Sequence, residues 1–142
     1  MTNIHQRPKE ANGKRFRDFE MDLIVDRYNH AILTVVEHST NMLFMTKLPH
    51  GKKSESLARE VCRLLLPYRK HIKTITTDNG PDFAAHKLIT EYLGVVVYFA
   101  DPYASWQKGT IENTNKLIRQ YIPKKANFDD FTDKKIAMIQ KK

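Results

Sequence analysis

Apolar and polar positions alternate along the first third of the chain, which is the pattern of half-buried β-strands. Three such runs follow one another closely, and short polar breaks at residues 27–29 and 38–40 separate them. Because breaks of this length leave room only for tight turns, the pattern predicts an antiparallel meander. The three expected strands are Asp18 to Asp26, His30 to Glu37 and Asn41 to Leu48.

After the meander the apolar spacing changes to that of a helix and then alternates between helix and strand. The run Asp78-Asn79-Gly80-Pro81 ends a short β-branched strand, and Gly94 closes the following helix. The expected elements are a helix from Ser54 to Tyr68, a strand from Ile72 to Thr77, a helix from about Phe83 to Leu93 and a strand from Val95 to Phe99.

One further helix is predicted from Thr110 to about Tyr121, where Pro123 stops it. Its expected apolar face consists of Ile111, Leu117, Ile118, Tyr121 and Ile122, and its other face is polar. The remainder of the chain contains a second helix start at Thr132 or Asp133.

The order of three strands, helix, strand, helix, strand and helix predicts an α/β fold with a mixed five-stranded sheet flanked by helices. Residues 18–125 form the expected core domain. Residues 1–17 carry five basic residues against Glu10 and no apolar period, so we expect a flexible basic arm. Residues 126–142 are expected to be a truncated segment, part of a last helix.

The net charge indicates a class of binding partner, and the number of cysteines indicates the cellular compartment. Lysine and arginine number 24 against 16 acids, a formal net charge of +8 that favours a polyanionic partner. The single cysteine, Cys62, excludes an internal disulfide and fits a buried helical position in a reducing compartment. No run reaches the roughly eighteen apolar residues of a membrane span, and no signal peptide is visible. We therefore expect a soluble, cytoplasmic protein without a membrane partner.

Two acids occupy positions in or after strands where they need an explanation. Asp22 lies between the apolar residues Met21 and Leu23, and its ordinary interpretation is a solvated edge face. Asp18, Glu20 and Asp26 would share that face. Asp78 follows a buried strand, where ligand sites are often built, although an acid followed by Asn-Gly is also an ordinary turn.

A third acid, Glu112, lies on the polar face of the helix predicted from Thr110. Its ordinary interpretation is a solvated face with a weak Glu112 to Lys116 pair. Phosphodiester chemistry uses two magnesium ions about 4 Å apart, for which manganese substitutes, and such hard cations prefer carboxylate oxygens. Carboxylates converging from two strands and a helix would suffice to hold them.

These acids also carry a family resemblance. Asp22, the run Thr77-Asp78-Asn79-Gly80, and Glu112 after 33 intervening residues resemble the DDE pattern of transposases and retroviral-type integrases. More narrowly, several blocks resemble the IS-thirty family of bacterial insertion-sequence transposases, and the resemblance covers about residues 17 to 131. The blocks are Phe19-Glu20-Met21-Asp22, Tyr98-Phe99-Ala100-Asp101-Pro102-Tyr103, Trp106 to Asn115, and Arg119-Gln120-Tyr121-Ile122-Pro123-Lys124.

The resemblance implies a ribonuclease H-like fold with Asp22, Asp78 and Glu112 as catalytic residues and metal ligands. It implies metal-dependent DNA strand cleavage and strand transfer at transposon ends, by a bacterial protein associated with the nucleoid when it acts. It also implies a homo-oligomer in the full-length protein. The family places a helix-turn-helix region before this core, so we expect sequence-specific recognition of transposon ends to be missing here.

Five residues around the expected site are predicted to contact DNA. They flank or share the face of Glu112, where basic and amide side chains suit phosphate oxygens. The ordinary alternatives are packing for the tryptophan and a solvated charged face for the others. The five are Trp106, Lys108, Asn115, Lys116 and Arg119.

Two other functions remain open from the residues themselves. The same carboxylates fit a ribonuclease H-like nuclease that hydrolyses nucleic acid without joining ends. A different class of protein is also compatible, namely a non-catalytic DNA-binding or oligomerisation remnant. A strand-transfer assay distinguishes the nuclease from a transposase core, and metal binding at the acids distinguishes the non-catalytic remnant from an active core.

Overall fold

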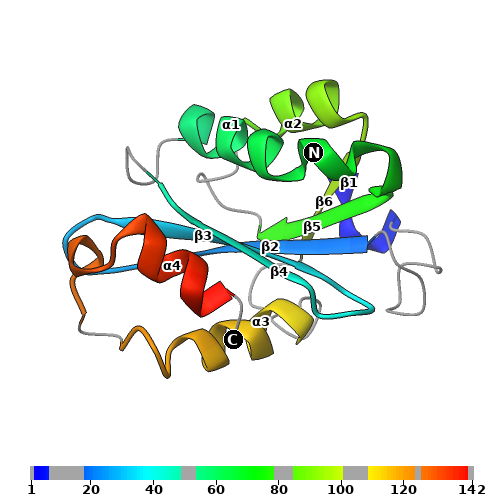
Figure 1. Cartoon of the computed structure of the whole chain (residues 1–142). Coiled ribbons are helices and arrows are strands. Elements are labelled where there is room, and N and C mark those ends of the chain that lie inside the picture. The colour runs from blue at the N-terminus through cyan, green and yellow to red at the C-terminus, as the bar shows by residue number, and fades with distance from the viewer. Residues whose placement is uncertain are drawn as a thin grey trace.

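The computed structural model of the chain describes residues 2–6, 18–48, 54–78, 85–100, 109–123 and 126–140. A mixed sheet crosses the centre of the molecule, and helices cover both of its faces (Figure 1). The strands are β1 (Thr2–Asn3), β2 (Asp18–Val25), β3 (Ala31–Glu37), β4 (Leu43–Lys47), β5 (Thr74–Asp78) and β6 (Val96–Ala100). The α-helices are α1 (Ser54–Leu65), α2 (His86–Leu93), α3 (Gly109–Ile118) and α4 (Asp133–Gln140).

Strand order in the sheet is β1-β6-β5-β2-β3-β4. Strands β2, β3 and β4 pair antiparallel as the predicted meander, whereas β5 pairs parallel to β2 and β6 parallel to β5. The five predicted strands and the mixed sheet are confirmed. Strand β2 is central, with β3 on one side and β5 on the other.

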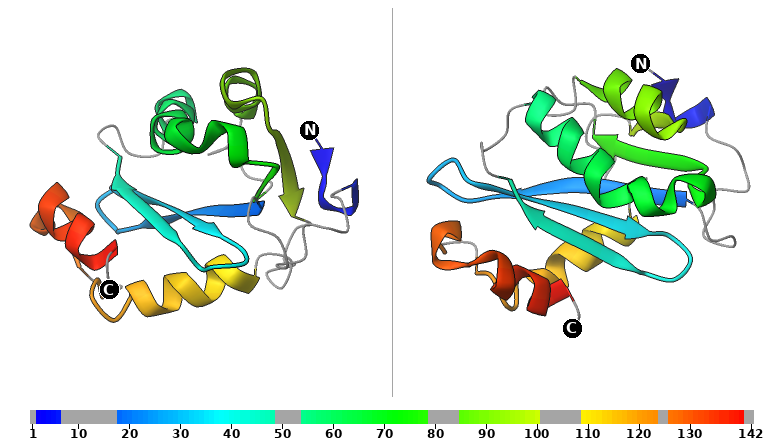
Figure 2. Two further views of the ribbon diagram at one scale, coloured as in Figure 1. Left: turned by 45° about the vertical axis from the view of Figure 1, so that its right-hand side comes forward. Right: turned by 45° about the horizontal axis from the view of Figure 1, so that its top comes forward.

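Two hydrophobic cores hold the layers together, one on each face of the sheet. Helices α1 and α2 pack on one face, where Leu57, Val61 and Ile89 are fully buried (Figure 2). Helices α3 and α4 cover the other face, where Ile118 and Ile136 pack against Ile24, Ile32 and Met45 of the meander. The sheet is therefore buried between two helical layers.

Acidic side chains cap the two hairpin turns of the meander. Asp26 Oδ1 accepts the N–H groups of Tyr28 and His30 at 2.9 and 2.8 Å. Glu37 Oε1 accepts the backbone and hydroxyl groups of Ser39 and Thr40, at 2.7 to 2.9 Å. Both turns use the polar breaks expected from the sequence, and each acid stabilises its turn by satisfying N–H groups that the strands leave unpaired.

Helix α1 ends earlier than the periodicity predicts, at Leu65 rather than Tyr68. A 3₁₀ helix, η2 (Leu66–His71), takes over with Pro67 in its first turn. Proline lacks the N–H that continues an α-helix, which accounts for the change of helix type. Gly94 closes α2 as predicted, in a left-handed conformation with φ 67° and its N–H on Thr90 O.

The apolar face predicted for α3 is confirmed for three of its five residues and wrong for the other two. Ile111, Ile118 and Ile122 are buried, but Leu117 and Tyr121 are 61% and 46% exposed. The three isoleucines fall on one stripe at the helical period, whereas the other two positions each lie one residue away from it.

The N-terminus differs from the expected arm in residues 2–6. Strand β1 extends the sheet by pairing parallel with β6, and the 3₁₀ helix η1 (Ile4–Gln6) follows it. Ile4 is 6% exposed, so its apolar side chain packs into the protein and adds to the strand pairing of this short segment. Residues 7–17 lie outside the described residues. No helix in the described part of the chain is long and apolar enough to cross a membrane.

Candidate active site

Asp22 lies on the central strand β2, opposite Thr34 of β3. Its side chain is half-buried. The Leu23 N–H donates to Asp22 Oδ1 at 2.8 Å, which fixes one carboxylate oxygen close to the strand. The second oxygen, Oδ2, faces helix α3.

Asn115 of α3 holds that second oxygen. Its Nδ2 donates to Asp22 Oδ2 at 3.2 Å. The Thr34 hydroxyl lies 3.1 Å from Asn115 Oδ1 and 3.3 Å from the Asp22 carbonyl oxygen, so it can donate to either acceptor. A network across β2, β3 and α3 thus orients both the carboxylate and the helix that packs over it.

Asp78 is the last residue of β5, the strand that lies parallel to β2. The register pairs Glu20 with Thr76, so Asp22 and Asp78 each stand two residues further along neighbouring strands. The pairing of β2 with β5 ends at Glu20 and Thr76, and continuing its register by two residues would bring Asp22 and Asp78 to the same level of the sheet. The side chain of Asp78 lies outside the described residues.

Glu112 belongs to α3, one helical turn before Asn115. Its backbone position is therefore tied to β2 by the contact that Asn115 makes, while its side chain lies outside the described residues. Among the side chains that are described, no group of three histidine, cysteine or acidic residues is arranged to hold a metal. Asp22 is the one predicted ligand whose side chain is described.

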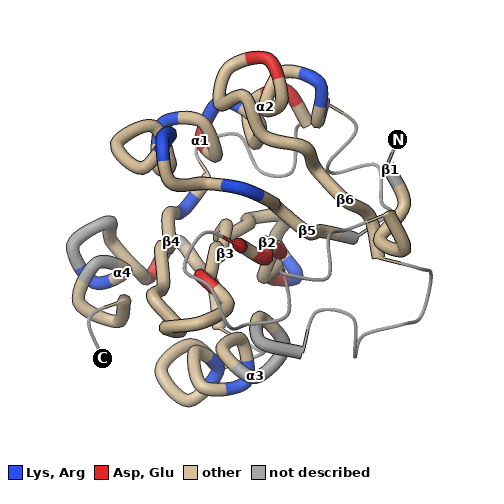
Figure 3. The backbone as a smooth tube through the Cα atoms, turned by 90° about the vertical axis from the view of Figure 1, so that its right-hand side faces the viewer, with Lys and Arg blue, Asp and Glu red and all other residues tan. Residues whose placement is uncertain are grey.

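The alternative interpretation of the first strand, a solvated acidic face, does not hold for Asp18 and Glu20. Asp18 and Glu20 are each 2% exposed, and acidic positions gather on the central strand β2 while basic positions lie on the neighbouring α3 (Figure 3). The Thr74 hydroxyl donates to Asp18 Oδ1 at 2.7 Å, and His38 Nε2 lies 3.9 Å from Glu20 Oε2. These acids are part of the interior below the Asp22 carboxylate.

Asp26, at the end of the same strand, is also buried, with 8% exposure. Its Oδ2 accepts the Phe128 N–H at 2.8 Å and lies 2.7 Å from His30 Nδ1. Burial acts to raise the pKa of Asp26, but the hydrogen bonds that it accepts outweigh this and lower the pKa from 3.8 to about 2. Asp26 therefore joins the first hairpin to the segment that precedes α4.

The predicted DNA contacts divide into different environments. Lys116 is exposed on α3. Arg119 is engaged with the protein itself, since its guanidinium reaches the carbonyl oxygens of Val25 at 3.3 Å and Ile122 at 3.5 Å and lies over the Phe128 ring. Burial lowers the pKa of Arg119. Trp106 and Lys108 lie outside the described residues.

Thr34 is a site residue that the sequence reasoning did not single out. It is fully buried in the middle of β3, where both neighbours are apolar. One hydroxyl inside a fully buried strand requires a hydrogen-bond partner, and that isolated polar position is the signal that was available in the sequence.

A solved structure shares the fold of this chain. A chain in a simian T-cell lymphotropic virus intasome, solved in complex with PP2A regulatory subunit B56 gamma, matches with a TM-score of 0.66. The two chains are 17% identical, and the match covers 87% of this chain and 46% of that one. The likeness concerns the fold, which is ribonuclease H-like as predicted.

Sequence relatives are insertion-sequence transposases. The transposase for insertion sequence element IS4351 of Bacteroides fragilis is 42% identical over 143 residues, which cover 99% of this chain and 43% of that protein. Transposase InsI for insertion sequence element IS30A of Escherichia coli is 35% identical over 140 residues, covering 97% of this chain and 36% of that protein. No family model matches the chain.

The predicted resemblance to insertion-sequence transposases is thereby confirmed. The chain spans about two fifths of the length of these relatives and is homologous to that part of them over nearly its whole length.

Proposed function

We propose that the chain is the catalytic core of a transposase that cleaves DNA strands and transfers them, with Asp22, Asp78 and Glu112 as its catalytic carboxylates. The observation that carries the proposal is the relation of three elements. Asp22 and Asp78 each follow the last pair of the parallel strands β2 and β5 by two residues, and Asn115 contacts Asp22 from the helix that carries Glu112. The similarity to transposases supports the reaction class.

The residues fit a pair of magnesium ions by the chemistry of their donors. Carboxylate oxygens are the ligands that magnesium prefers, and Asp22 and Asp78 would be joined by Glu112 in holding it. When bound, magnesium or manganese supplies charge that stabilises the attacking and leaving oxygens of a phosphodiester displacement. The protein's own part includes holding the Asp22 carboxylate in one orientation, through the Leu23 N–H and Asn115 Nδ2.

The proposed substrate is DNA, both transposon ends and target. The net charge of +8 favours a polyanion, and the exposed Lys116 on α3 is positioned one turn after Glu112, where a phosphate could approach. Trp106, Lys108, Asn115 and Arg119 complete the proposed set of DNA contacts. Asn115 and Arg119 would have to break their hydrogen bonds within the protein before they could contact DNA. The exposed Lys116 is therefore the best-supported of the proposed DNA contacts.

Metal binding is the first test, because it does not require a DNA-recognition region. Calorimetric titration with manganese should show binding to the wild-type chain and a loss of at least about ten-fold in affinity for Asp78→Ala. Asp130→Ala, which removes an exposed acid from a different part of the chain, is the matched control. Equal binding by all three proteins would overturn the carboxylate assignment.

The type of reaction needs a second test with cut DNA ends. A transposase core should join a free 3′ hydroxyl to a target plasmid, whereas a nuclease would only nick the plasmid. Metal-dependent nicking without any joined product, in an assay where a transposase that joins such ends serves as the positive control, would favour the nuclease.

A further inference from the structure

The first hairpin, which joins β2 to β3, presents an aromatic ring and a guanidinium group at the surface. Tyr28 is 51% exposed, and its neighbour Arg27 is exposed as well. The central guanidinium carbon of Arg27 lies 5.9 Å from the centre of the Tyr28 ring. Neither residue belongs to the candidate active site or to the predicted DNA contacts.

The backbone of this turn is held in place by hydrogen bonds. Asp26 Oδ1 accepts the N–H groups of Tyr28 and His30, and the Asp26 N–H donates to the His30 carbonyl oxygen at 3.1 Å. Asn29 takes the left-handed conformation that the turn requires, with φ 68°. A side chain on an ordered turn loses less conformational freedom on binding than one on a loose loop, so Tyr28 is presented ready to bind.

Helix α3 runs alongside β2 from the candidate site to this turn (Figure 1). Asn115 contacts Asp22 in the middle of the strand. One helical turn later, Arg119 reaches the carbonyl oxygen of Val25, the last residue of β2. The strand covers about 10 Å from Asp22 to Val25, and DNA advances about 3.4 Å per nucleotide. The hairpin therefore lies within a few nucleotides of the candidate site.

Two exposed cations at this part of the surface are available to phosphate groups. Arg27 of the hairpin and Lys116 of α3 have no carboxylate partner among the residues that the structure describes. Asp26, the acid of the same turn, is 8% exposed and its oxygens are occupied by N–H groups. Exposed basic side chains of this kind fit the phosphate oxygens of nucleic acid.

The exposed ring determines which form of nucleic acid fits. Bases inside a duplex are stacked on both faces, whereas an unpaired base has a face free to stack on a tyrosine. Proteins bind single strands with aromatic rings placed beside basic groups. A single exposed tyrosine is ordinary on a protein surface. Here the ring lies on an ordered turn, with exposed cations on the same turn and on the adjoining helix.

We propose that Arg27 and Tyr28, together the hairpin contact, bind an unpaired stretch of the DNA strand that enters the candidate site. Tyr28 stacks on a base and Arg27 contacts a phosphate. The identity of the ligand as DNA rests on the proposed function, whereas the geometry of the contact does not. The hairpin contact lets the chain distinguish opened DNA from a closed duplex close to the reacting phosphate.

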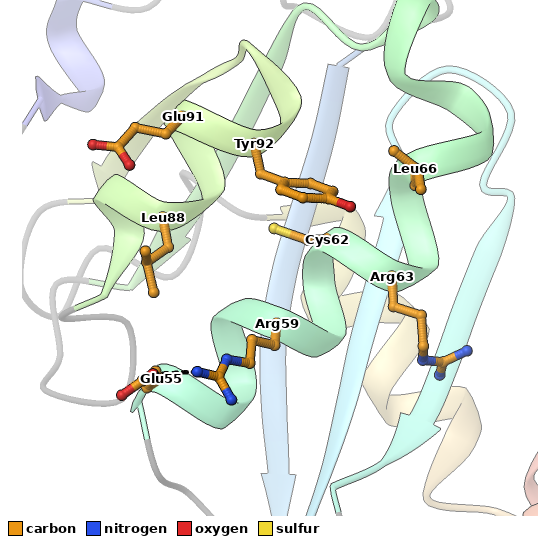
Figure 4. Close-up of a pocket in the computed structure, with 8 residues that line it drawn as sticks. All are labelled: Glu55, Arg59, Cys62, Arg63, Leu66, Leu88, Glu91 and Tyr92. Atoms are coloured by element: carbon orange, nitrogen blue, oxygen red, sulfur yellow. Dashed lines mark hydrogen bonds and ion pairs between the residues drawn. The ribbon is translucent and has the colours of Figure 1, made fainter.

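Fluorescence anisotropy without metal tests the role of the ring, with a labelled single strand of about 12 nucleotides and the same sequence as a duplex. Tyr28→Ala should weaken single-strand binding by about five-fold or more and duplex binding by less than about two-fold. Tyr28→Phe keeps the ring and should bind like the wild type. The matched control is Tyr92→Ala. Tyr92 is 53% exposed, and its ring lies beside Cys62 between α1 and α2, on the other face of the sheet (Figure 4).

Salt dependence tests the role of the guanidinium. Arg27→Ala should weaken single-strand binding and make the plot of log affinity against log salt shallower by about 0.7, as expected for one lost phosphate contact. Lys73→Ala removes another exposed cation and should leave this slope unchanged. Lys73 precedes β5 beside the start of β2, so it lies at the end of that strand opposite the hairpin.

Tyr28→Ala that binds the single strand as tightly as the wild type, or that loses single-strand and duplex binding equally, would overturn the hairpin contact. A wild-type chain that binds no single strand would also overturn it. These measurements need no metal, so they are independent of the carboxylates. Manganese binding without any effect of Tyr28 refutes the hairpin contact alone, whereas an effect of Tyr28 without manganese binding supports it and refutes the carboxylate assignment.

Discussion

Asn115 Nδ2 donates a hydrogen bond to Asp22 Oδ2 at 3.2 Å, joining residues that are 93 positions apart. The same asparagine side chain lies 3.1 Å from the Thr34 hydroxyl. Asn115 therefore gives helix α3 a polar contact with the sheet at the level of the candidate site, and Glu112 lies one turn before it. The contact assigns Asn115 a positioning role that its expected DNA contact did not include.

Replacing Asn115 should weaken metal binding even when no DNA is present. Asn115→Ala removes the donor to Asp22, so the carboxylate loses its fixed orientation. We expect a fall of about 10- to 100-fold in manganese affinity, which is typical when a partner of a metal ligand is lost. Calorimetry without DNA measures this directly.

Two comparisons separate this role from a DNA contact. Thr34→Val removes the hydroxyl that orients Asn115 and should lower metal affinity in the same direction but less. If Asn115→Ala leaves manganese affinity unchanged and weakens only DNA binding, Asn115 is a DNA contact and not a positioning residue. Leu23 amide exchange in the absence of metal reports whether the Asp22 carboxylate has been released.

Asp26→Asn should destabilise the fold by roughly 2 to 4 kcal/mol. One oxygen of Asp26 accepts the Tyr28 and His30 N–H groups and the other accepts the Phe128 N–H, so in either orientation the new NH₂ group faces a donor. Urea unfolding measures the loss. The exposed Asp130→Asn should change stability by less than about 0.5 kcal/mol, and equal effects of the two substitutions would contradict the structural role of Asp26.

Acid should remove the contribution of Asp26 over a defined range. Its folded pKa of about 2 is below its ordinary value of 3.8, so the stabilisation is complete above about pH 4 and is lost as the pH falls towards 2. A pKa lowered by this amount corresponds to roughly 2 kcal/mol. The free energy of unfolding of Asp26→Asn should therefore vary less between pH 4 and pH 2 than that of the wild type, and parallel curves would refute the assignment.

Cys62 should react slowly with thiol reagents in the folded chain. Burial raises the pKa of this thiol, and only 8% of the residue is exposed, so thiolate is scarce and difficult to reach. Alkylation by iodoacetamide at neutral pH is expected to be at least about ten-fold slower than in urea. A rate that is equal in both conditions would show that Cys62 is readily accessible in the folded chain.

Removing α4 should make the chain aggregate. The Met45 N–H of the edge strand β4 donates to Gln140 Oε1 at 2.7 Å, and Ile136 covers the second core. Deletion of residues 133–142 exposes both the edge and the apolar surface beneath it, which favours strand pairing between chains. Light scattering at increasing concentration measures this, and Met138→Ala, on the exposed side of the same helix, should scatter like the wild type.

Sequence patterns predicted the meander, the alternation of helices and strands, and the resemblance because each rests on local periodicity or on contiguous motifs. Burial of the acids on β2 was not predictable in this way. Alternation placed Asp18 and Glu20 on one face, but it could not tell that the face would be covered. Coverage depends on elements that are distant in the sequence.

The contact of Asn115 with Asp22 could not be predicted from the sequence for the same reason. Its position one turn after Glu112 suggested a shared helical face, and that face could equally meet solvent, DNA or the sheet. In the structure this face meets the sheet, because Asn115 contacts Asp22 and Thr34. These two residues become neighbours only through the pairing of β2 with β3. Similarly, Pro67 ended α1 where the apolar period alone predicted continuation.

The span of 93 positions between Asp22 and Asn115 has a consequence during synthesis. The meander can form soon after it leaves the ribosome, because its strands are neighbours in the chain. Helix α3 emerges much later, so a partly made chain contains the meander with an Asp22 carboxylate that lacks the Asn115 contact. The orientation of the Asp22 carboxylate by Asn115 is therefore completed only when the last third of these 142 residues has been translated.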